Sequence, residues 1–144
     1  MNRLRTTRFM VDLVEQVDER GLAVSPTLPE GCKNLLIDID GTICKEVIIP
    51  DSGGKKDYAN HIPMPERIAK VNALYDAGHT IKYMTARGCV SGVDYFNLTN
   101  NQLIKWGAKF HELSVGEKEN YDIWIDDKAF WSENFFRETG ESYE

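Results

Sequence analysis

Short apolar runs of this sequence end, in three places, in side chains that can do chemistry. In chain order these side chains are Asp38 and Asp40, then Thr85-Ala86-Arg87, and then Asp126 and Asp127. Four carboxylates gathered at one place repel one another unless a cation compensates their charge. Oxygen ligands without a Cys or His cluster are the set that Mg²⁺ prefers. The sequence therefore predicts a Mg²⁺ site with a phosphate as companion ligand. Thr85 would donate a hydrogen bond to that phosphate, and a lysine would neutralise it.

Each of these motifs also has an ordinary structural explanation. An Asp that follows a strand is often a helix cap or a turn residue, and Thr is common in the same positions. Asp126 and Asp127 could simply cap the last helix. All three motifs in this order, each at the end of an expected strand, favour the chemical interpretation.

Alternating strands and helices are expected to position these motifs. Apolar runs predict strands over residues 33–39, 79–84, 109–113 and 121–125, and helical spacing predicts helices over residues 7–20, 65–77, 93–106 and 129–136. Residues 44–63 read as a strand, a turn and a return strand, in a loose hairpin. The alternation predicts an α/β fold with a doubly wound parallel sheet. Ligands of such sheets bind beyond the carboxyl ends of the strands, where the motifs lie.

Composition limits the class of protein. The 144 residues suit one domain, here a core over residues 32–144 that follows a helical extension and linker over residues 1–31. A net charge of −6 disfavours nucleic acid as a partner. No apolar run approaches a membrane span or a secretory signal, so no membrane partner is expected. The three cysteines form no CxxC pair, which is typical of a reducing compartment. We expect a cytoplasmic protein.

The motif order resembles the haloacid dehalogenase (HAD) superfamily of phosphohydrolases. The DxDGT motif of that family is matched by Asp38-Ile39-Asp40-Gly41-Thr42, its strand-ending Thr by Thr85, and its final pair of acids by Asp126-Asp127. The resemblance runs from about residue 33 to residue 136. It implies a three-layer, Rossmann-like α/β/α core.

The resemblance also implies roles for these residues. Asp38 would attack phosphorus and form an aspartyl-phosphate, and Asp40, its side chain free, would protonate the leaving oxygen and then activate water. Mg²⁺ would be held by Asp38, the backbone carbonyl of Asp40, and Asp126, with Asp127 acting directly or through water. Thr85, Ala86, Arg87 and a lysine would bind the substrate phosphate.

Two lysines compete for the lysine position of the family. Relatives carry it in a Gly-Lys-Pro-like loop just before the fourth strand, where this sequence reads Gly116-Glu117-Lys118-Glu119. An extra residue separates glycine from lysine, and the proline is missing. We favour Lys118 and keep Lys109 as the alternative.

The spaces between motifs are too short for a folded cap domain, so a small capless member is expected. Its site would be open to a large substrate or covered by a second copy of the chain. The leading interpretation is a Mg²⁺-dependent phosphomonoester hydrolase that acts on a sugar phosphate or similar small metabolite. The alternatives are a nucleic-acid-end or nucleotide phosphatase, a two-metal nuclease-like enzyme, and a non-catalytic HAD-like interaction domain. The histidines, among them His61, fit no triad, and Cys44 is expected to be a small buried apolar residue.

Overall fold

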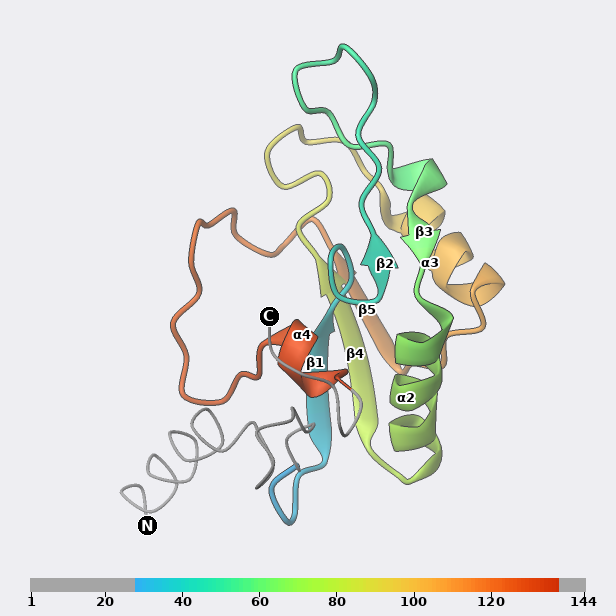
Figure 1. Ribbon diagram of the computed structural model, residues 1–144, viewed down its shortest axis with the longest axis vertical. Helices are drawn as coiled ribbons and strands as arrows, with labels where there is room; N and C mark the ends of the chain where they lie inside the picture. Colours follow the sequence, from blue (N-terminus) through green and yellow to red (C-terminus); the bar gives the residue numbers. More distant parts are fainter. Residues whose placement is uncertain (1–27, 138–144) are drawn as a thin grey trace. The chain divides into compact units, whose positions relative to one another are not determined.

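The computed structural model describes residues 28–137 of the chain (Figure 1). Its contacts divide the chain into two units. The core unit is Gly31–Tyr121, and the second unit takes Met1–Glu30 with Asp122–Glu144. The helix expected over residues 7–20 lies outside the described residues.

A parallel sheet forms the centre of the core unit. Its strands are β1 (Asn34–Asp38), β4 (Thr80–Thr85) and β5 (Glu112–Val115), in the order β1-β4-β5. Leu35 pairs with Ile81 and Ile37 with Tyr83, so these side chains share one face of the sheet. Ile81 and Tyr83 are fully buried and form part of the core with Leu103 and Val71. The buried face of the sheet and its parallel direction agree with the expected α/β class.

Helices α2 (Pro65–Asp76) and α3 (Phe96–Lys105) connect these strands. Pro65 suits the first helical turn of α2, and Gly78, with φ of 101°, allows the chain to turn after it. Helix α2 packs against β4 and α3 against β5. The sheet grows in one direction from β1, and right-handed crossovers place both helices on the same face. Figure 1 shows them on the same side of the sheet.

This arrangement is simpler than the predicted one. A doubly wound sheet needs strands on both sides of β1 and helices on both faces. In the described core unit, β1 is an edge strand, and α2 and α3 form one helical layer. What the structure shows is a small α/β fold with a three-stranded parallel sheet.

A hairpin follows β1, as the sequence predicts for residues 44–63. Strands β2 (Cys44–Lys45) and β3 (Ile62–Pro63) pair antiparallel, and Ile48 forms a bridge with Lys56 nearer the tip. A short 3-10 helix, η1 (Tyr58–Asn60), leads back to β3. Figure 1 shows the hairpin reaching beyond the carboxyl ends of the sheet strands. It therefore lies at the edge where the sequence places the candidate site.

The strand expected over residues 121–125 does not form. The segment has no strand pairing, and Ile123 and Ile125 are 79% and 94% exposed. An apolar run becomes a strand only when a neighbouring strand supplies its backbone partners. Helix α4 (Ser132–Phe135) is also shorter than expected, and β5 begins three residues later. None of the helices in residues 28–137 is long and apolar enough to cross a membrane.

Candidate active site

Asp38 ends β1 and points two oxygen atoms at two different donors. Thr42 Oγ1 donates a hydrogen bond to Oδ2 at 3.0 Å, and Lys118 Nζ donates to Oδ1 at 2.8 Å. The side chain of Asp38 stays 37% exposed. Asp38 is therefore held in place by the protein and is still accessible from solvent.

A tight turn after β1 returns Thr42 to Asp38. The amides of Thr42 and Ile43 both donate to the carbonyl of Ile39, at 3.0 Å each. Gly41 has φ of 80°, a left-handed conformation in which a Cβ atom is unfavourable. The backbone conformation of this turn thus explains why a glycine, Gly41, occupies this position of the DxDGT pattern.

Lys118 is the lysine that the fold brings to Asp38. Its side chain is only 10% exposed. Burial pulls the pKa of Lys118 down, but the hydrogen bond to Asp38 and the charge of Asp38 outweigh burial and raise that pKa. Lys109 instead lies on the surface and pairs with Asp76 at 2.9 Å. Of the two candidate lysines, only Lys118 contacts a candidate catalytic residue.

Asp40 lies deeper than Asp38 and is surrounded by donors. Its side chain is 16% exposed. Arg87 Nε donates to Oδ2 at 3.0 Å and Arg87 Nη2 to Oδ1 at 2.8 Å. Thr85 Oγ1 donates to Oδ2 at 3.2 Å, and His61 Nδ1 lies 2.9 Å from Oδ1. Both oxygens of Asp40 are therefore engaged by protein donors, and its proposed role in proton transfer stays a prediction.

These contacts favour the ionised form of Asp40. Burial acts to raise the pKa of this carboxyl, but the hydrogen bonds and charge of Arg87, and then those of His61, outweigh burial and lower the pKa below 3.8. This ionised form can accept a proton, but the lowered pKa also makes it a weaker base than an ordinary Asp. It is less suited to donating a proton at neutral pH.

Arg87 is buried rather than presented to a ligand. Its side chain is 0% exposed, and beside its bonds to Asp40 it donates from Nη1 to Thr99 Oγ1 at 3.1 Å and to Gln102 Oε1 at 2.7 Å. The expected role of Arg87 in holding a substrate anion is not supported by this geometry. The sequence could identify Arg87 as a cation near the site. It could not show that Arg87 pairs with Asp40, because that partner depends on packing.

Thr85 and Ala86 lie beside Arg87 at the end of β4. Thr85 is buried, and its hydroxyl is directed to Asp40 in this structure. Ala86 is half-buried, and its carbonyl accepts a hydrogen bond from the amide of Cys89 at 2.9 Å. Both residues therefore lie at the predicted edge of the sheet, close to Asp40.

His61 was not among the expected site residues. It lies near the base of the hairpin, where β2 pairs with β3, and the antiparallel register brings it back towards Cys44. The predicted hairpin could have indicated that His61 lies near Cys44, because a return strand must bring its residues opposite the outgoing strand.

Asp40, Cys44 and His61 form a cluster that has the ligand types of a metal site. Their ligand atoms lie within 4.8 Å of one another. Without a metal, burial and then the nearby charge of Asp40 raise the pKa of the Cys44 thiol to about 12. One observation counts against a metal here. Arg87 already compensates the charge of Asp40. The cluster is better explained as a hydrogen-bonded group around Asp40.

Asp126 and Asp127 belong to the second unit and are exposed. Asp126 Oδ1 accepts a hydrogen bond from the amide of Lys128 at 3.3 Å, as in a local turn. They do not follow a strand, contrary to expectation. Their role as metal ligands stays a prediction from the sequence.

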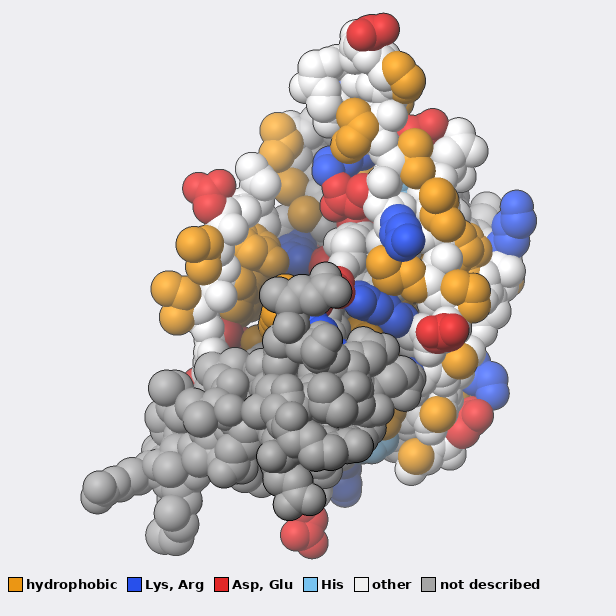
Figure 2. All heavy atoms as spheres, in the orientation of Figure 1, with side chains coloured by type: hydrophobic (Ala, Val, Ile, Leu, Met, Phe, Trp, Pro, Cys, Tyr) orange, Lys and Arg blue, Asp and Glu red, His pale blue; other side chains and the backbone are white. Residues whose placement is uncertain are grey.

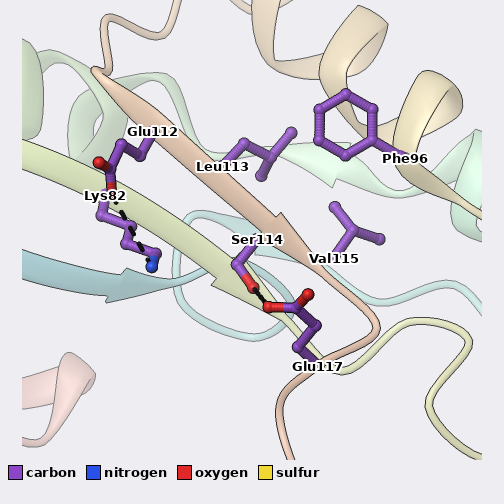
Figure 3. A pocket seen from close by; sticks show the side chains of 7 residues that line it. All are labelled: Lys82, Phe96, Glu112, Leu113, Ser114, Val115 and Glu117. Atoms are coloured by element: carbon purple, nitrogen blue, oxygen red, sulfur yellow. Dashed lines mark hydrogen bonds and ion pairs between the residues drawn. The ribbon is translucent and has the colours of Figure 1, made fainter.

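A hollow of about 400 Å³ lies elsewhere in the core unit, along β5 (Figure 3). Its polar side chains pair with one another. Lys82 lies 3.8 Å from Glu112, and Ser114 donates to Glu117 at 3.3 Å. Neither Asp38 nor Asp40 lines it. The hollow is therefore separate from the candidate active site.

Comparison with known proteins supports the fold only. No protein-family model matches the chain, and no curated protein matches it. A crystal structure from Vibrio cholerae, described as an MCSG target, has a similar fold with a TM-score of 0.59 and 23% sequence identity. The likeness covers 72% of this chain and 87% of that one.

Proposed function

We propose that this chain is a Mg²⁺-dependent phosphomonoester hydrolase of the HAD type that acts through a phosphorylated Asp38. The observation that carries the proposal is the contact between Lys118 Nζ and Asp38 Oδ1 at 2.8 Å. These residues are 80 positions apart, yet they meet at the carboxyl end of β1. A carboxylate attacks an anionic phosphate well only when a cation offsets the repulsion.

The proposed mechanism gives Asp38 and Lys118 the first step. Asp38 is partly exposed, so its carboxylate is accessible to a phosphoryl group. Lys118 would bind the phosphoryl oxygens and stabilise the charge that develops on them. A bound Mg²⁺ would supply further neutralisation of this charge, and in the core unit Asp38 and the backbone carbonyl of Asp40 would hold it. The hard oxygen donors of Asp38 and Asp40 fit such an ion.

Asp40 would act in the second step. Its ionised form, which Arg87 and His61 favour, is the form that takes a proton from the attacking water. For the first step, the same group would have to carry a proton to the leaving oxygen. That requires the negative charge of the bound phosphate to raise the pKa of Asp40, while Arg87 keeps the carboxylate in place. Thr85 would then turn its hydroxyl hydrogen from Asp40 to a phosphate oxygen.

The substrate class remains the one that the sequence suggests, a sugar phosphate or a similar small metabolite. Between Asp38 and Lys118 the described chain adds only a two-stranded hairpin to the α/β core, which supports a capless enzyme whose site is open or is covered by a second copy. The finer fold, a three-layer HAD core, belongs to the same proposal. The three free cysteines support the expected cytoplasmic location.

A phosphate-release assay tests the proposal. Phosphorylated sugars, nucleotides, and oligonucleotides with 3′- or 5′-phosphates would be incubated with the full chain and Mg²⁺. We expect release from at least one class, and a fall of about three orders of magnitude or more in Asp38→Asn, because the covalent route is lost.

The chain offers a matched control for this variant. Asp76 is also paired with a lysine at 2.9 Å, but that pair lies on the surface. Asp76→Asn should keep wild-type turnover. No release from any substrate, or equal activity in Asp38→Asn and the wild type, would overturn the proposed function.

A further inference from the structure

One buried guanidinium joins three parts of the core unit. Arg87 follows β4 and bonds both oxygens of Asp40, at 3.0 and 2.8 Å. Its third nitrogen, Nη1, donates to Thr99 and Gln102, two side chains of α3. Such a planar fork fixes the plane of a carboxylate as well as its position, which a lysine cannot do.

The same group of residues reaches the base of the hairpin. The guanidinium carbon of Arg87 lies 4.8 Å from the centre of the Tyr58 ring. Gln102 Nε2 donates to the carbonyl of Tyr58 at 2.5 Å, and the Tyr58 ring makes edge contacts with His61 and Tyr95. His61 in turn lies 2.9 Å from Asp40. Both ends of the network therefore return to the same carboxylate.

We infer that Arg87 is a positioning residue, which holds the carboxylate of Asp40 and the base of the hairpin in one arrangement. The expected effect of Arg87 on turnover rests on the proposed function. Arg87 touches no substrate in this scheme, because its side chain is fully buried and directed at Asp40, Thr99 and Gln102.

A positioning role and a merely structural role predict different results. If Arg87 served stability alone, its replacement would lower the melting temperature and leave the kcat of the folded fraction unchanged. If it positions Asp40, the folded enzyme should bind substrate as before and turn it over slowly. A displacement of about 1 Å in a catalytic group lowers turnover by about 100-fold.

The closing experiment compares Arg87→Lys with Gln102→Met in the full chain. Arg87→Lys keeps the charge but loses the fork, and we expect kcat to fall about 10- to 100-fold with KM changed by less than about threefold. Gln102→Met leaves Asp40 untouched and removes the link to Tyr58, so a smaller fall in kcat is expected. Gln102→Met also provides the test if Arg87→Lys does not fold. If Arg87→Lys folds and has the wild-type kcat, the inference is overturned. If Arg87→Lys is unfolded, a wild-type kcat in Gln102→Met overturns it.

A second readout does not depend on activity. The amide of His61 donates to the carbonyl of Tyr58 at 3.2 Å, so it exchanges with solvent when η1 opens. Both variants should speed hydrogen exchange at residues 58–61 and leave β4 unchanged, whereas Lys109→Ala, which breaks a surface pair, should change neither. Unaltered exchange at residues 58–61 would overturn the inference. A wild-type chain without phosphatase activity would refute the proposed function, and the inference would then be decided by exchange.

Discussion

Arg87 donates two parallel hydrogen bonds to Asp40, from Nε to Oδ2 at 3.0 Å and from Nη2 to Oδ1 at 2.8 Å. The neighbouring acid of the same motif, Asp38, has a lysine instead and remains more exposed. Two carboxylates separated by a single residue are thus given different surroundings. Different surroundings are how proteins assign different roles to chemically identical groups.

The two lysines provide a direct test of the site. Lys118→Ala removes the cation beside Asp38, and we expect turnover to fall by about two to three orders of magnitude, the size typical of one preorganised electrostatic donor. Lys109→Ala breaks only the surface pair with Asp76 and should leave turnover near the wild-type value. Steady-state assays on the best substrate of the panel measure both. The reverse pattern would assign the phosphate-binding role to Lys109.

Asp40→Asn tests the proton-transfer role with two leaving groups. With an alkyl phosphate, turnover should fall by about two to four orders of magnitude, because no group can accept or donate the proton. With nitrophenyl phosphate, whose leaving group needs no proton, phosphorylation of Asp38 should suffer less than its hydrolysis. The intermediate should then accumulate.

Mass spectrometry after a rapid acid quench would detect this intermediate as phosphate on the peptide that contains Asp38. Asp38→Asn is the control and should give no phosphopeptide. Equal losses on both leaving groups, without any phosphopeptide, would remove Asp40 from the mechanism.

Metal dependence distinguishes a Mg²⁺ site at Asp38 from a metal site in the cluster of Asp40, Cys44 and His61. EDTA should abolish phosphate release, Mg²⁺ should restore it, and calorimetry should give one Mg²⁺ per chain. Cys44→Ala should leave Mg²⁺ affinity unchanged, since a hard ion does not use a thiol. Tight Zn²⁺ binding that Cys44→Ala removes would show that the cluster is a metal site. Two Mg²⁺ ions about 4 Å apart in a crystal soak would instead favour the nuclease-like alternative.

The lowered pKa of Asp40 predicts how stability depends on acid. Below pH 3.8 the unfolded chain binds a proton at Asp40 that the folded chain does not, so stability falls as pH falls through this window. Asp40→Asn lacks this group, and its free energy of unfolding should depend less on pH, by up to about 1.4 kcal/mol per unit. Urea unfolding at several pH values below 4 measures both slopes. Identical slopes would contradict the assigned pKa direction.

Gly88 is predicted to be a stability residue of the site. It has φ of 87°, and a Cβ atom added there would lie 2.1 Å from the carbonyl oxygen of Val93. Gly88→Ala should therefore lower the free energy of unfolding by about 2 kcal/mol or more, since the clash is with backbone. Gly54→Ala is the matched control, because φ is 93° there and nothing lies within 4 Å. It should cost only about 1 kcal/mol. Equal costs would show that the backbone near Gly88 can shift.

The sequence by itself determined the elements whose signals lie in neighbouring residues. The apolar run before Asp38 predicted β1, and Pro65 and Gly78 marked the two ends of α2 closely. The DxDGT pattern placed both acids at the carboxyl end of a strand. Periodicity, caps and turns are local interactions, so they can be recognised without knowledge of the fold.

Tertiary structure alone decided which distant groups meet. Arg87 lies 47 residues from Asp40, and nothing near either residue indicates that the guanidinium turns inward instead of towards a ligand. His61 joined the same carboxylate because of the hairpin register. Residues 121–125 had the composition of a buried strand but form no strand and are largely exposed. In each case the outcome depends on which partners the packed chain supplies, and single-residue types do not encode their own partners.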